Sequence, residues 1–592
     1  MSLKHKDMSI TRVRYLIFRT TSLLYTINKK YLISIIFFTL IISVFPSINV
    51  IALRELTNAI QNFPNSRYTL IQYILFYFTI SILSLFVTKI NEFLTFCFAN
   101  RISYHMNIQI LEKTSELSLT DFENADTYNK IQRADSQSDE VLFDYFFNFL
   151  SLIGSFITVI TSLFILIFWK WWLAFLIIII SILRSIIMIH FGREKFKIHT
   201  NRTSSERKKW YYSYLLKNDL SFKEIKIYQL HQYFLSMYKD IFNDFFSQDK
   251  FIQKKMILFD FLLSFINAMI QIVLVFLGSY DAATRKILIG DTISFIQSGN
   301  NVRNGADSFM TTLSVIVTSS MYLEQLFDFL DLETDIQVKA KKIQFKEPIE
   351  TIEFKNVNFK YGLSDVYALN NINFTFNTGC RYSIVGRNGS GKTTLTKLML
   401  GLYTNYSGTI KVNGIDLKEI DLASYWEKVG VLFQDYTKYE MTLKENIIFK
   451  NDISKNKDAK INKLLDTLDS SFFSTLLLSQ QLGFWFDNGL QLSGGQWIKI
   501  AISRALIREP SLLILDEPNA SLDNLAESNL MEIIKKSTQN RISLIITHRL
   551  KSLHALDAKV IFMFEGTING EGTVNQLLNT NLYFKELYDA EK

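Results

Sequence analysis

Five long apolar runs limit what this chain can fold into more than any other feature of its sequence. They span Tyr31–Leu53, Tyr68–Val87, Phe146–Phe168, Trp171–Ile189 and Ile257–Gly278. Each run is about 20 residues long, which lets one helix cross the roughly 30 Å hydrocarbon core of a bilayer. Water-soluble folds rarely carry several such runs, so the sequence predicts a multi-pass α-helical membrane domain.

A sixth apolar segment, Asp291–Leu323, is weaker than the other five. Polar and charged side chains interrupt it, namely Asn300, Asn301, Arg303, Asn304 and Asp307. Such a helix is costly against lipid but is tolerated where it lines a polar cavity. We therefore expect six membrane helices, the last of them facing a polar interior.

The formal net charge of +8 raises the question of a nucleic-acid partner. In a membrane protein, however, Lys and Arg gather in the cytoplasmic loops, and this chain has no nucleic-acid-binding motif. We expect no nucleic-acid partner. The two cysteines, Cys97 and Cys380, cannot build a disulfide framework or a metal cluster.

The character of the sequence changes near Leu330–Glu350. From Glu350 onward, short β-branched or aromatic runs alternate with helical stretches. The runs are Ile352–Phe354, Tyr382–Val385, Val429–Phe433, Leu512–Leu515 and Ser543–Ile546. This pattern is typical of an α/β domain on a largely parallel sheet. We expect a membrane domain over residues 1–330, a linker over 331–349 and the α/β domain over 350–592.

A glycine-rich segment follows the expected strand Tyr382–Val385 and precedes a helical run. Its residues are Gly386, Arg387, Asn388, Gly389, Ser390, Gly391, Lys392, Thr393 and Thr394. This is a P-loop in its strand–loop–helix setting, in which backbone N–H groups and a helix N-terminus hold phosphates. Lys392 is predicted to reach the β- and γ-phosphates of ATP, and the Thr393 hydroxyl to bind Mg²⁺.

Two carboxylates end the expected strand Leu512–Leu515. Asp516 suits the Mg²⁺-linked position beside the phosphates, and Glu517 suits a general base that orients the attacking water. A strand that ends in two acidic residues without function is the alternative, and the nearby P-loop argues against it.

Between these motifs lie Ser493, Gly494, Gly495 and Gln496, in the order of the signature of ATP-binding-cassette (ABC) ATPases, which this part of the chain resembles. The resemblance implies further roles. Tyr361 resembles the aromatic residue that stacks on adenine, Gln434 the Q-loop glutamine, which binds Mg²⁺ together with Thr393 and Asp516, Asp523 the D-loop aspartate, and His548 the switch histidine. In this family two cassettes sandwich ATP head to tail, so the resemblance implies a homodimer with two complete ATPase sites.

The ATPase and the loop charges together predict the topology. The loops Thr88–Tyr145 and His190–Met256 are long and rich in Lys and Arg, which places them and both termini in the cytoplasm. An odd number of spans would put the ATPase outside, away from ATP. This supports counting the polar sixth segment as a span.

The fused arrangement resembles ABC exporters, and several phrases resemble lantibiotic (lanthipeptide) exporters of the nisin and subtilin type. These phrases are DFENADTYN, TSSERKKWYYSYLL, DLSFKEIKI and LSGGQW. In exporters, Asp121–Asn129 and Asn218–Lys226 would be coupling helices, although ordinary solvated helices fit the residues equally well. Trp497 and the segment Gly483–Gly489 depart from most cassettes.

The resemblance implies ATP-driven export of a lanthipeptide precursor with its leader attached, across the cytoplasmic membrane of a bacterium. It also suggests docking onto lanthipeptide modification enzymes. About 30 residues precede the first apolar run, which is too short for a peptidase domain, so we expect leader removal to happen elsewhere. Two alternatives share the sequence features: a multidrug or lipid exporter of the same fold, and a non-transporting regulator.

Polar residues inside the fifth run offer a substrate path. Asp260, Asn267 and Gln271 share one helix face, and Arg184 lies in the fourth run. They could line a hydrophilic conduit or serve as interhelical hydrogen-bond partners.

Overall fold

The computed structural model describes residues 10–62, 67–332, 342–362, 364–449, 455–519, 524–537, 540–550 and 553–590. The chain forms two compact units. The helical unit comprises Met1–Ser115 and Asp126–Leu332, and the α/β unit comprises Glu116–Ala125 and Glu333–Lys592. The α/β unit is therefore discontinuous in sequence.

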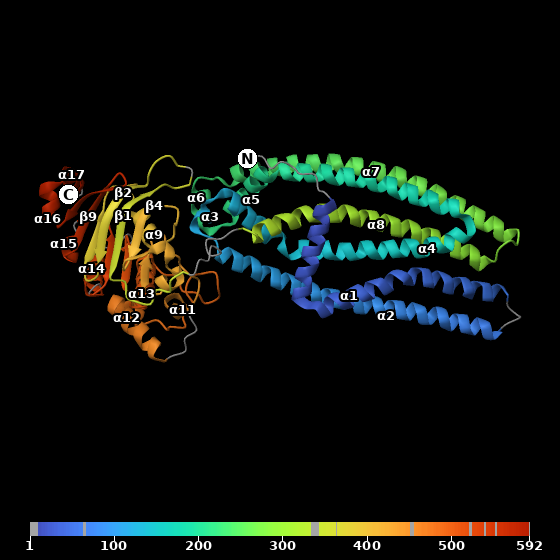
Figure 1. Ribbon diagram of the computed structural model, residues 1–592, viewed down its shortest axis with the longest axis horizontal. Helices are drawn as coiled ribbons and strands as arrows, with labels where there is room; N and C mark the ends of the chain where they lie inside the picture. The colour runs from blue at the N-terminus through green and yellow to red at the C-terminus, as the bar shows by residue number, and fades with distance from the viewer. Residues whose placement is uncertain are drawn as a thin grey trace. The chain divides into compact units, whose positions relative to one another are not determined.

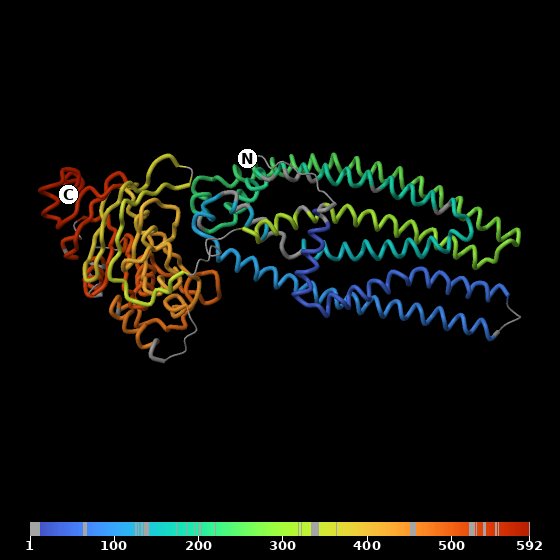
Figure 2. Tube along the Cα trace, in the orientation of Figure 1, coloured from blue at the N-terminus to red at the C-terminus, as the bar shows by residue number. Residues whose placement is uncertain are grey.

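Long helices build the helical unit (Figure 1). They are α1 (Ile10–Gln61), α2 (Arg67–Ser115), α4 (Ala125–Asn201), α5 (Thr203–Lys217), α6 (Asp219–Ile227), α7 (His231–Ala283) and α8 (Ile289–Leu330). The backbone leaves helical angles at Asn28 in α1 and at Lys170 in α4. Figure 2 shows the chain reversing direction within α4. The break in α1 comes from Asn28, whose side-chain oxygen accepts from the N–H groups of Lys30 and Tyr31, and not from Pro46.

Five stretches of helix are long and apolar enough to cross a membrane: Arg14–Gln61, Tyr68–Ser115, Val141–Trp172, Phe175–Lys195 and His231–Ala283. Each overlaps one of the five predicted runs. The sixth predicted run lies in α8, a helix of 42 residues that packs against α1 and α7. Its polar side chains keep it below the hydropathy of the others, and its membrane crossing stays a prediction.

Small residues and polar contacts hold the helices of this unit together. A Cβ atom on Gly305 of α8 would lie 2.9 Å from Val159 Cγ2 of α4, so the two backbones approach closely there. Nearby, Ser155 Oγ donates to Ser308 Oγ at 3.0 Å. Packing through small residues and interhelical hydrogen bonds is the usual way that membrane helices associate.

Two sheets form the centre of the α/β unit. The first is antiparallel, in the order β2-β1-β4-β5, and the second has the order β10-β9-β3-β8-β7-β6. The strands are β1 (Thr351–Phe359), β2 (Leu369–Asn377), β3 (Arg381–Val385), β4 (Ser407–Val412), β5 (Ile415–Asp416), β6 (Val429–Leu432), β7 (Leu512–Asp516), β8 (Ile542–Ile546), β9 (Lys559–Phe564) and β10 (Thr567–Gly572). The five predicted strand segments lie in β1, β3, β6, β7 and β8.

The central strands β3, β8, β7 and β6 are parallel neighbours, and every residue of β7 and β8 is buried. Strands buried on both faces read as continuous apolar runs, which explains their clear sequence signal. The helices of the unit include α9 (Lys392–Met399), α10 (Leu422–Trp426), α11 (Leu443–Ile447), α12 (Lys455–Phe473), α13 (Gly494–Leu506), α14 (Asn524–Ser537), α15 (Leu553–Leu556), α16 (Val574–Thr580) and α17 (Leu582–Asp589).

A short helix from early in the chain, α3 (Leu119–Glu123), belongs to the α/β unit. Ser118 caps its N-terminus in a capping box with Asp121. Leu119 packs against the main core cluster of the unit, and the hydroxyl of Tyr403 donates to Glu123 Oε1 at 2.6 Å. α3 overlaps the predicted coupling stretch Asp121–Asn129 at Asp121–Glu123, and the rest of that stretch continues into α4.

Candidate nucleotide site

The P-loop connects β3 to α9, as the sequence predicts. Gly391 is the N-cap of α9 at φ +99°, and a Cβ atom there would lie 2.7 Å from the Ala368 carbonyl oxygen and from Leu369 Cδ2. Both the left-handed backbone and the close approach require glycine. Arg387, Asn388 and Gly389 are exposed on the loop.

Lys392 is buried at the start of α9 and faces back into the loop. Its Nζ donates to the carbonyl oxygens of Gly386 at 2.8 Å and Arg387 at 3.0 Å. Burial lowers the pKa of Lys392, while the charges of Glu517 and Asp516 counteract this effect. The two carboxylates and the two carbonyl oxygens of the loop thus partly offset the cost of burying the ammonium group.

Thr393 and Asp516 meet at the end of β7. The Thr393 hydroxyl donates to Asp516 Oδ2 at 3.2 Å. Burial raises the pKa of Asp516 to about 6, the Thr393 hydrogen bond lowers it, and the charge of Glu517 raises it further. The other oxygen of this carboxylate, Oδ1, is buried without a hydrogen-bond partner in the described part of the chain, and so is the Ser390 hydroxyl.

This donor set fits Mg²⁺. A hydroxyl oxygen and an unsatisfied carboxylate oxygen are hard ligands, and Mg²⁺ is commonly bound by one or two protein groups together with substrate phosphates. Among the described residues no group of three or more His, Cys, Asp or Glu side chains could hold a metal ion by itself. A metal here would need phosphate oxygens as well.

Glu517 lies directly after β7 with its backbone in the left-handed region at φ +50°. Its Oε1 lies 2.6 Å from His548 Nε2, and its Oε2 accepts from Gln434 Nε2 at 2.9 Å. The three side chains come from the ends of three neighbouring strands, β6, β7 and β8. Gln434 thus contacts Glu517, and no hydrogen bond in the described part of the chain joins it to Thr393 or Asp516, the residues with which it is predicted to bind Mg²⁺.

Tyr361 lies beside the P-loop helix. Its hydroxyl is 2.9 Å from Thr394 Oγ1, and its ring packs edge-on against Phe359 and Tyr403 at centroid distances of 5.0 and 5.6 Å. The ring is half-buried. Stacking of this ring on adenine stays a prediction.

The signature residues begin α13. Ser493 caps the helix, its hydroxyl accepting from the N–H of Gln496 at 3.3 Å, while its own N–H donates to Gln496 Oε1 at 2.8 Å. Ser493 is exposed, and Gly494 and Gly495 are partly exposed. In the described part of the chain, no hydrogen bond joins Ser493–Gln496 to the P-loop. The capping box uses the N–H groups of Ser493 and Gln496, which leaves those of Gly494 and Gly495 at the helix N-terminus, a favourable place for an anion.

Asp523 and Trp497 are two further residues that the sequence singles out. Asp523, the predicted D-loop residue, lies outside the described residues. Trp497 is 5% exposed and belongs to a core cluster with Leu443, Ile447 and Ile461, so it packs in the interior.

A supporting network beside His548 was not predicted from the sequence. Arg549 forms an ion pair with Glu527, whose other oxygen accepts from Asn519 Nδ2 at 2.5 Å. Arg549 directly follows His548, and Asn519 follows Glu517 by two residues. Their nearness in sequence to His548 and Glu517 is the signal that could have pointed to this network. The network joins the turn that carries Glu517 to the turn that carries His548.

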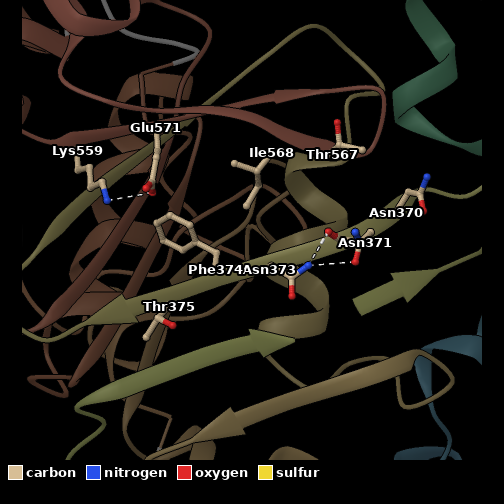
Figure 3. Close-up of a pocket in the computed structure, with 9 residues that line it drawn as sticks. All are labelled: Asn370, Asn371, Asn373, Phe374, Thr375, Lys559, Thr567, Ile568 and Glu571. Carbon is tan, nitrogen blue, oxygen red and sulfur yellow. Dashed lines mark hydrogen bonds and ion pairs between the residues drawn. The ribbon is translucent and has the colours of Figure 1, made fainter. Parts of the chain in front are cut away.

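A polar groove of about 680 Å³ lies elsewhere on the α/β unit, between β2 and the β9–β10 hairpin (Figure 3). On the hairpin side, Lys559 of β9 and Glu571 of β10 form an ion pair of 3.0 Å, and on the β2 side Asn373 Nδ2 donates to Asn371. These polar groups satisfy one another and include no catalytic combination.

The comparisons with known proteins agree with this geometry. The family model "ABC transporter" matches residues 369–520. The subtilin transport ATP-binding protein SpaT of Bacillus subtilis is 36% identical over 97% of this chain and 94% of its own length. The nisin transport ATP-binding protein NisT of Lactococcus lactis subsp. lactis is 34% identical over 97% of this chain and 96% of its own length.

Among solved structures, a bacterial Atm1-family ABC exporter with ATP bound has the same fold. Its TM-score is 0.80 at 17% sequence identity, over 95% of this chain and 98% of that one. The likeness therefore extends over both units of the chain.

Proposed function

The chain belongs to the ABC exporters that fuse a membrane domain to an ATPase domain, and from that premise we propose that it exports a lanthipeptide precursor, leader attached, by alternating access. The assignment of a lanthipeptide cargo is supported by the similarity to the subtilin and nisin transport proteins, which extends over 97% of the chain. A relationship confined to the cassette would support only ATP hydrolysis, because cassettes are shared by many kinds of transporter.

We propose that Glu517 orients and activates the attacking water. His548 and Gln434 hold its two carboxylate oxygens at 2.6 and 2.9 Å, which fixes the orientation of the carboxylate. Lys392 binds the β- and γ-phosphates from the P-loop, and Tyr361 supports the adenine.

Thr393 and Asp516 would hold Mg²⁺ with the nucleotide. The bound ion would neutralise charge on the phosphates during hydrolysis. Gln434, which follows β6 at the same edge of the sheet and donates to Glu517, would be the third protein ligand of the ion. The buried Oδ1 of Asp516 is the atom that most needs a partner.

The family of half-transporters implies dimerisation. We propose a homodimer in which Ser493–Gln496 of each chain complete the site of the other, with Asp523 at the interface. The open N-terminus of α13 supports this, because it offers N–H groups for the γ-phosphate and makes none of its hydrogen bonds to the described part of its own P-loop. Every predicted catalytic position is intact, so both sites would hydrolyse ATP.

We further propose six spans, with both termini and the ATPase on the cytoplasmic side of a bacterial plasma membrane, and domain boundaries at 1–330, 331–349 and 350–592. Docking onto lanthipeptide modification enzymes belongs to the same proposal. For the substrate path, Asn267 is 3% exposed, and Asp260 Oδ1 lies 2.5 Å from Arg184 Nη2. Asn267 and Asp260 thus contribute to helix packing, and so does Asp307 of α8, whose Oδ2 lies 2.6 Å from Arg184 Nη1. The proposed path therefore rests on the other polar residues of α8, Asn300, Asn301, Arg303 and Asn304.

The test is secretion of a lanthipeptide precursor from cells that carry this chain or its Glu517→Gln variant. Leader-bearing peptide outside the cells only with the intact chain is the expected result. Retention of the peptide in both strains, with ATP hydrolysis by the purified protein, would reject the peptide cargo. Stimulation of that hydrolysis by small amphiphiles would then favour the multidrug or lipid exporter.

A further inference from the structure

A groove between α4 and α7 takes no part in the functions described above. It has a volume of about 780 Å³ and is lined by the end of α4 and one face of α7. Lys195, Lys250 and Lys254 line one part of it, and Leu258 and Phe261 line another. Figure 1 shows the second half of α4 and α7 running side by side in the helical unit.

The residues of α7 that line the groove recur at helical spacing. Phe246, Lys250, Lys254 and Leu258 follow one another at intervals of four residues and so share one face. Lys250 Nζ lies 6.0 Å from the centroid of the Phe246 ring. Beyond Phe246 this face is cationic at Lys250 and Lys254 and becomes apolar at Leu258, where the predicted fifth span begins.

The groove carries excess positive charge. Among the described residues that line it, the one carboxylate is Asp249, which already pairs with Arg202, with 3.0 Å between Oδ1 and Nη1. In the described part of the chain, Lys195, Lys250 and Lys254 have no carboxylate partner. All three are exposed, as are Leu258 at 55% and Phe261 at 67%.

The groove has a cationic part, formed by the three lysines, and an apolar part, formed by Leu258 and Phe261, at the predicted membrane boundary. A molecule with an anionic headgroup and an apolar chain would match both parts. A phosphate group would contact the ammonium groups, while an acyl chain would cover Leu258 and Phe261. A free phosphate would use only the lysines, and a neutral lipid would use only the apolar wall. We propose that this groove binds an anionic phospholipid of the cytoplasmic leaflet.

The experiment uses the full-length protein, purified in detergent and analysed by native mass spectrometry. The probes are phosphatidylglycerol and phosphatidylcholine with identical acyl chains, supplied at equal concentrations. The wild-type protein should retain phosphatidylglycerol preferentially. Each replacement, Lys250→Gln or Lys254→Gln, should reduce that preference about fivefold, the effect expected of one lysine near an anionic headgroup.

Lys239→Gln is the matched control. Lys239 is an exposed lysine on the same face of α7, eleven residues before Lys250 and so about 17 Å further from the membrane. It should leave the lipid preference unchanged.

Three outcomes would overturn the proposal. The first is equal retention of the two lipids by the wild-type protein. The second is displacement of phosphatidylglycerol by inorganic phosphate at the same concentration, which would identify a free anion as the ligand. The third is loss of the dimer in the Lys250→Gln/Lys254→Gln protein with no change in lipid preference, which would identify a second copy of the chain as the occupant.

Discussion

Glu517 occupies a backbone conformation that glutamate rarely adopts, at φ +50°. Strained positions of this kind persist where the surrounding structure holds them in place, and they gather at functional sites. Here the restraint is visible, since the N–H of Glu517 donates to the Ile546 carbonyl oxygen at 3.0 Å and both carboxylate oxygens have partners.

We expect Glu517→Gln to reduce ATP turnover about 100-fold or more, the usual loss for a general base, while nucleotide binding persists. Turnover and nucleotide affinity of the purified protein measure the two effects separately. Glu509→Gln is the control, because Glu509 is also at positive φ (51°) but pairs with Lys460 at 2.7 Å. Similar turnover in the two variants would contradict the role of Glu517.

Asp516 predicts a pH effect on stability. Burial raises its pKa from 3.8 to about 6, so the folded protein binds this proton more tightly than the unfolded chain does. Its contribution to the free energy of unfolding is therefore largest at low pH and is lost as pH rises from about 4 to about 6, by up to about 3 kcal/mol. Denaturation in this range, without nucleotide, should show a smaller loss in Asp516→Asn. Identical pH dependence in both proteins would refute the shift.

Replacement of Gly391 by alanine should have a steric cost. In Gly391→Ala the new Cβ meets the Ala368 carbonyl oxygen and Leu369 Cδ2, both at 2.7 Å, in addition to left-handed strain. Gly414→Ala carries the same kind of strain at φ +84° but has no atom within 4 Å of its Cβ. We expect Gly391→Ala to lower the free energy of unfolding by about 1–3 kcal/mol more than Gly414→Ala. Equal losses would mean that backbone strain alone sets the cost.

At the scale of elements, α3 is the clearest case of a short segment with a long-range role. Its five residues hold together through the Ser118 capping box, and Glu123 accepts the Tyr403 hydroxyl. Burial, followed by the bond to Glu123, raises the pKa of Tyr403, so the phenol stays protonated and donates at neutral pH.

We expect Tyr403→Phe to weaken the seating of α3 by about 1 kcal/mol, the net value of one hydrogen bond. If α3 couples the ATPase to transport, the peptide-stimulated part of ATP hydrolysis should fall more than the basal part. Tyr406→Phe is the matched control, since the Tyr406 hydroxyl is buried without a hydrogen-bond partner among the described residues. Equal effects of the two variants would argue against coupling through α3.

Arg184 joins three helices of the helical unit. Its Nη2 lies 2.5 Å from Asp260 of α7, and its Nη1 lies 2.6 Å from Asp307 of α8. The sequence places these three residues in three apolar segments, a pattern that fits either a conduit or contacts with one another. In the structure Asp260 pairs with Arg184, as a charge inside a membrane needs a partner, and its place along a conduit stays a prediction.

At the scale of the whole molecule, shared sites predict complementation between chains. Neither Lys392→Ala nor Gly494→Asp should hydrolyse ATP alone. Mixed subunits should recover about a quarter of wild-type turnover, because half of the dimers are mixed and each has one intact pair of P-loop and signature. The measurement is turnover after the two proteins are mixed and allowed to exchange subunits. No recovery, with exchange verified, would show that each chain completes its own site.

The sequence predicted local features best. The apolar runs and the P-loop are each continuous in sequence, so periodicity and spacing are sufficient to find them. The break at Asn28, the Glu123–Tyr403 bond and the Glu527–Arg549 network were missed, because each depends on side chains that only the folded chain brings together. The sequence identified Gln434 as a site residue but did not predict its hydrogen bond to Glu517.

The discontinuity of the α/β unit has a consequence for how such proteins recombine. Glu116–Ala125 is separated in sequence from the rest of that unit by the whole of Asp126–Leu332, yet its Leu119 and Glu123 belong to the unit's packing. A gene crossover near residue 340 would transplant Tyr403 without Glu123. A functional ATPase unit would then be transferred only if two segments were exchanged together. The short segment Glu116–Ala125 therefore limits the exchange of cassettes between exporters.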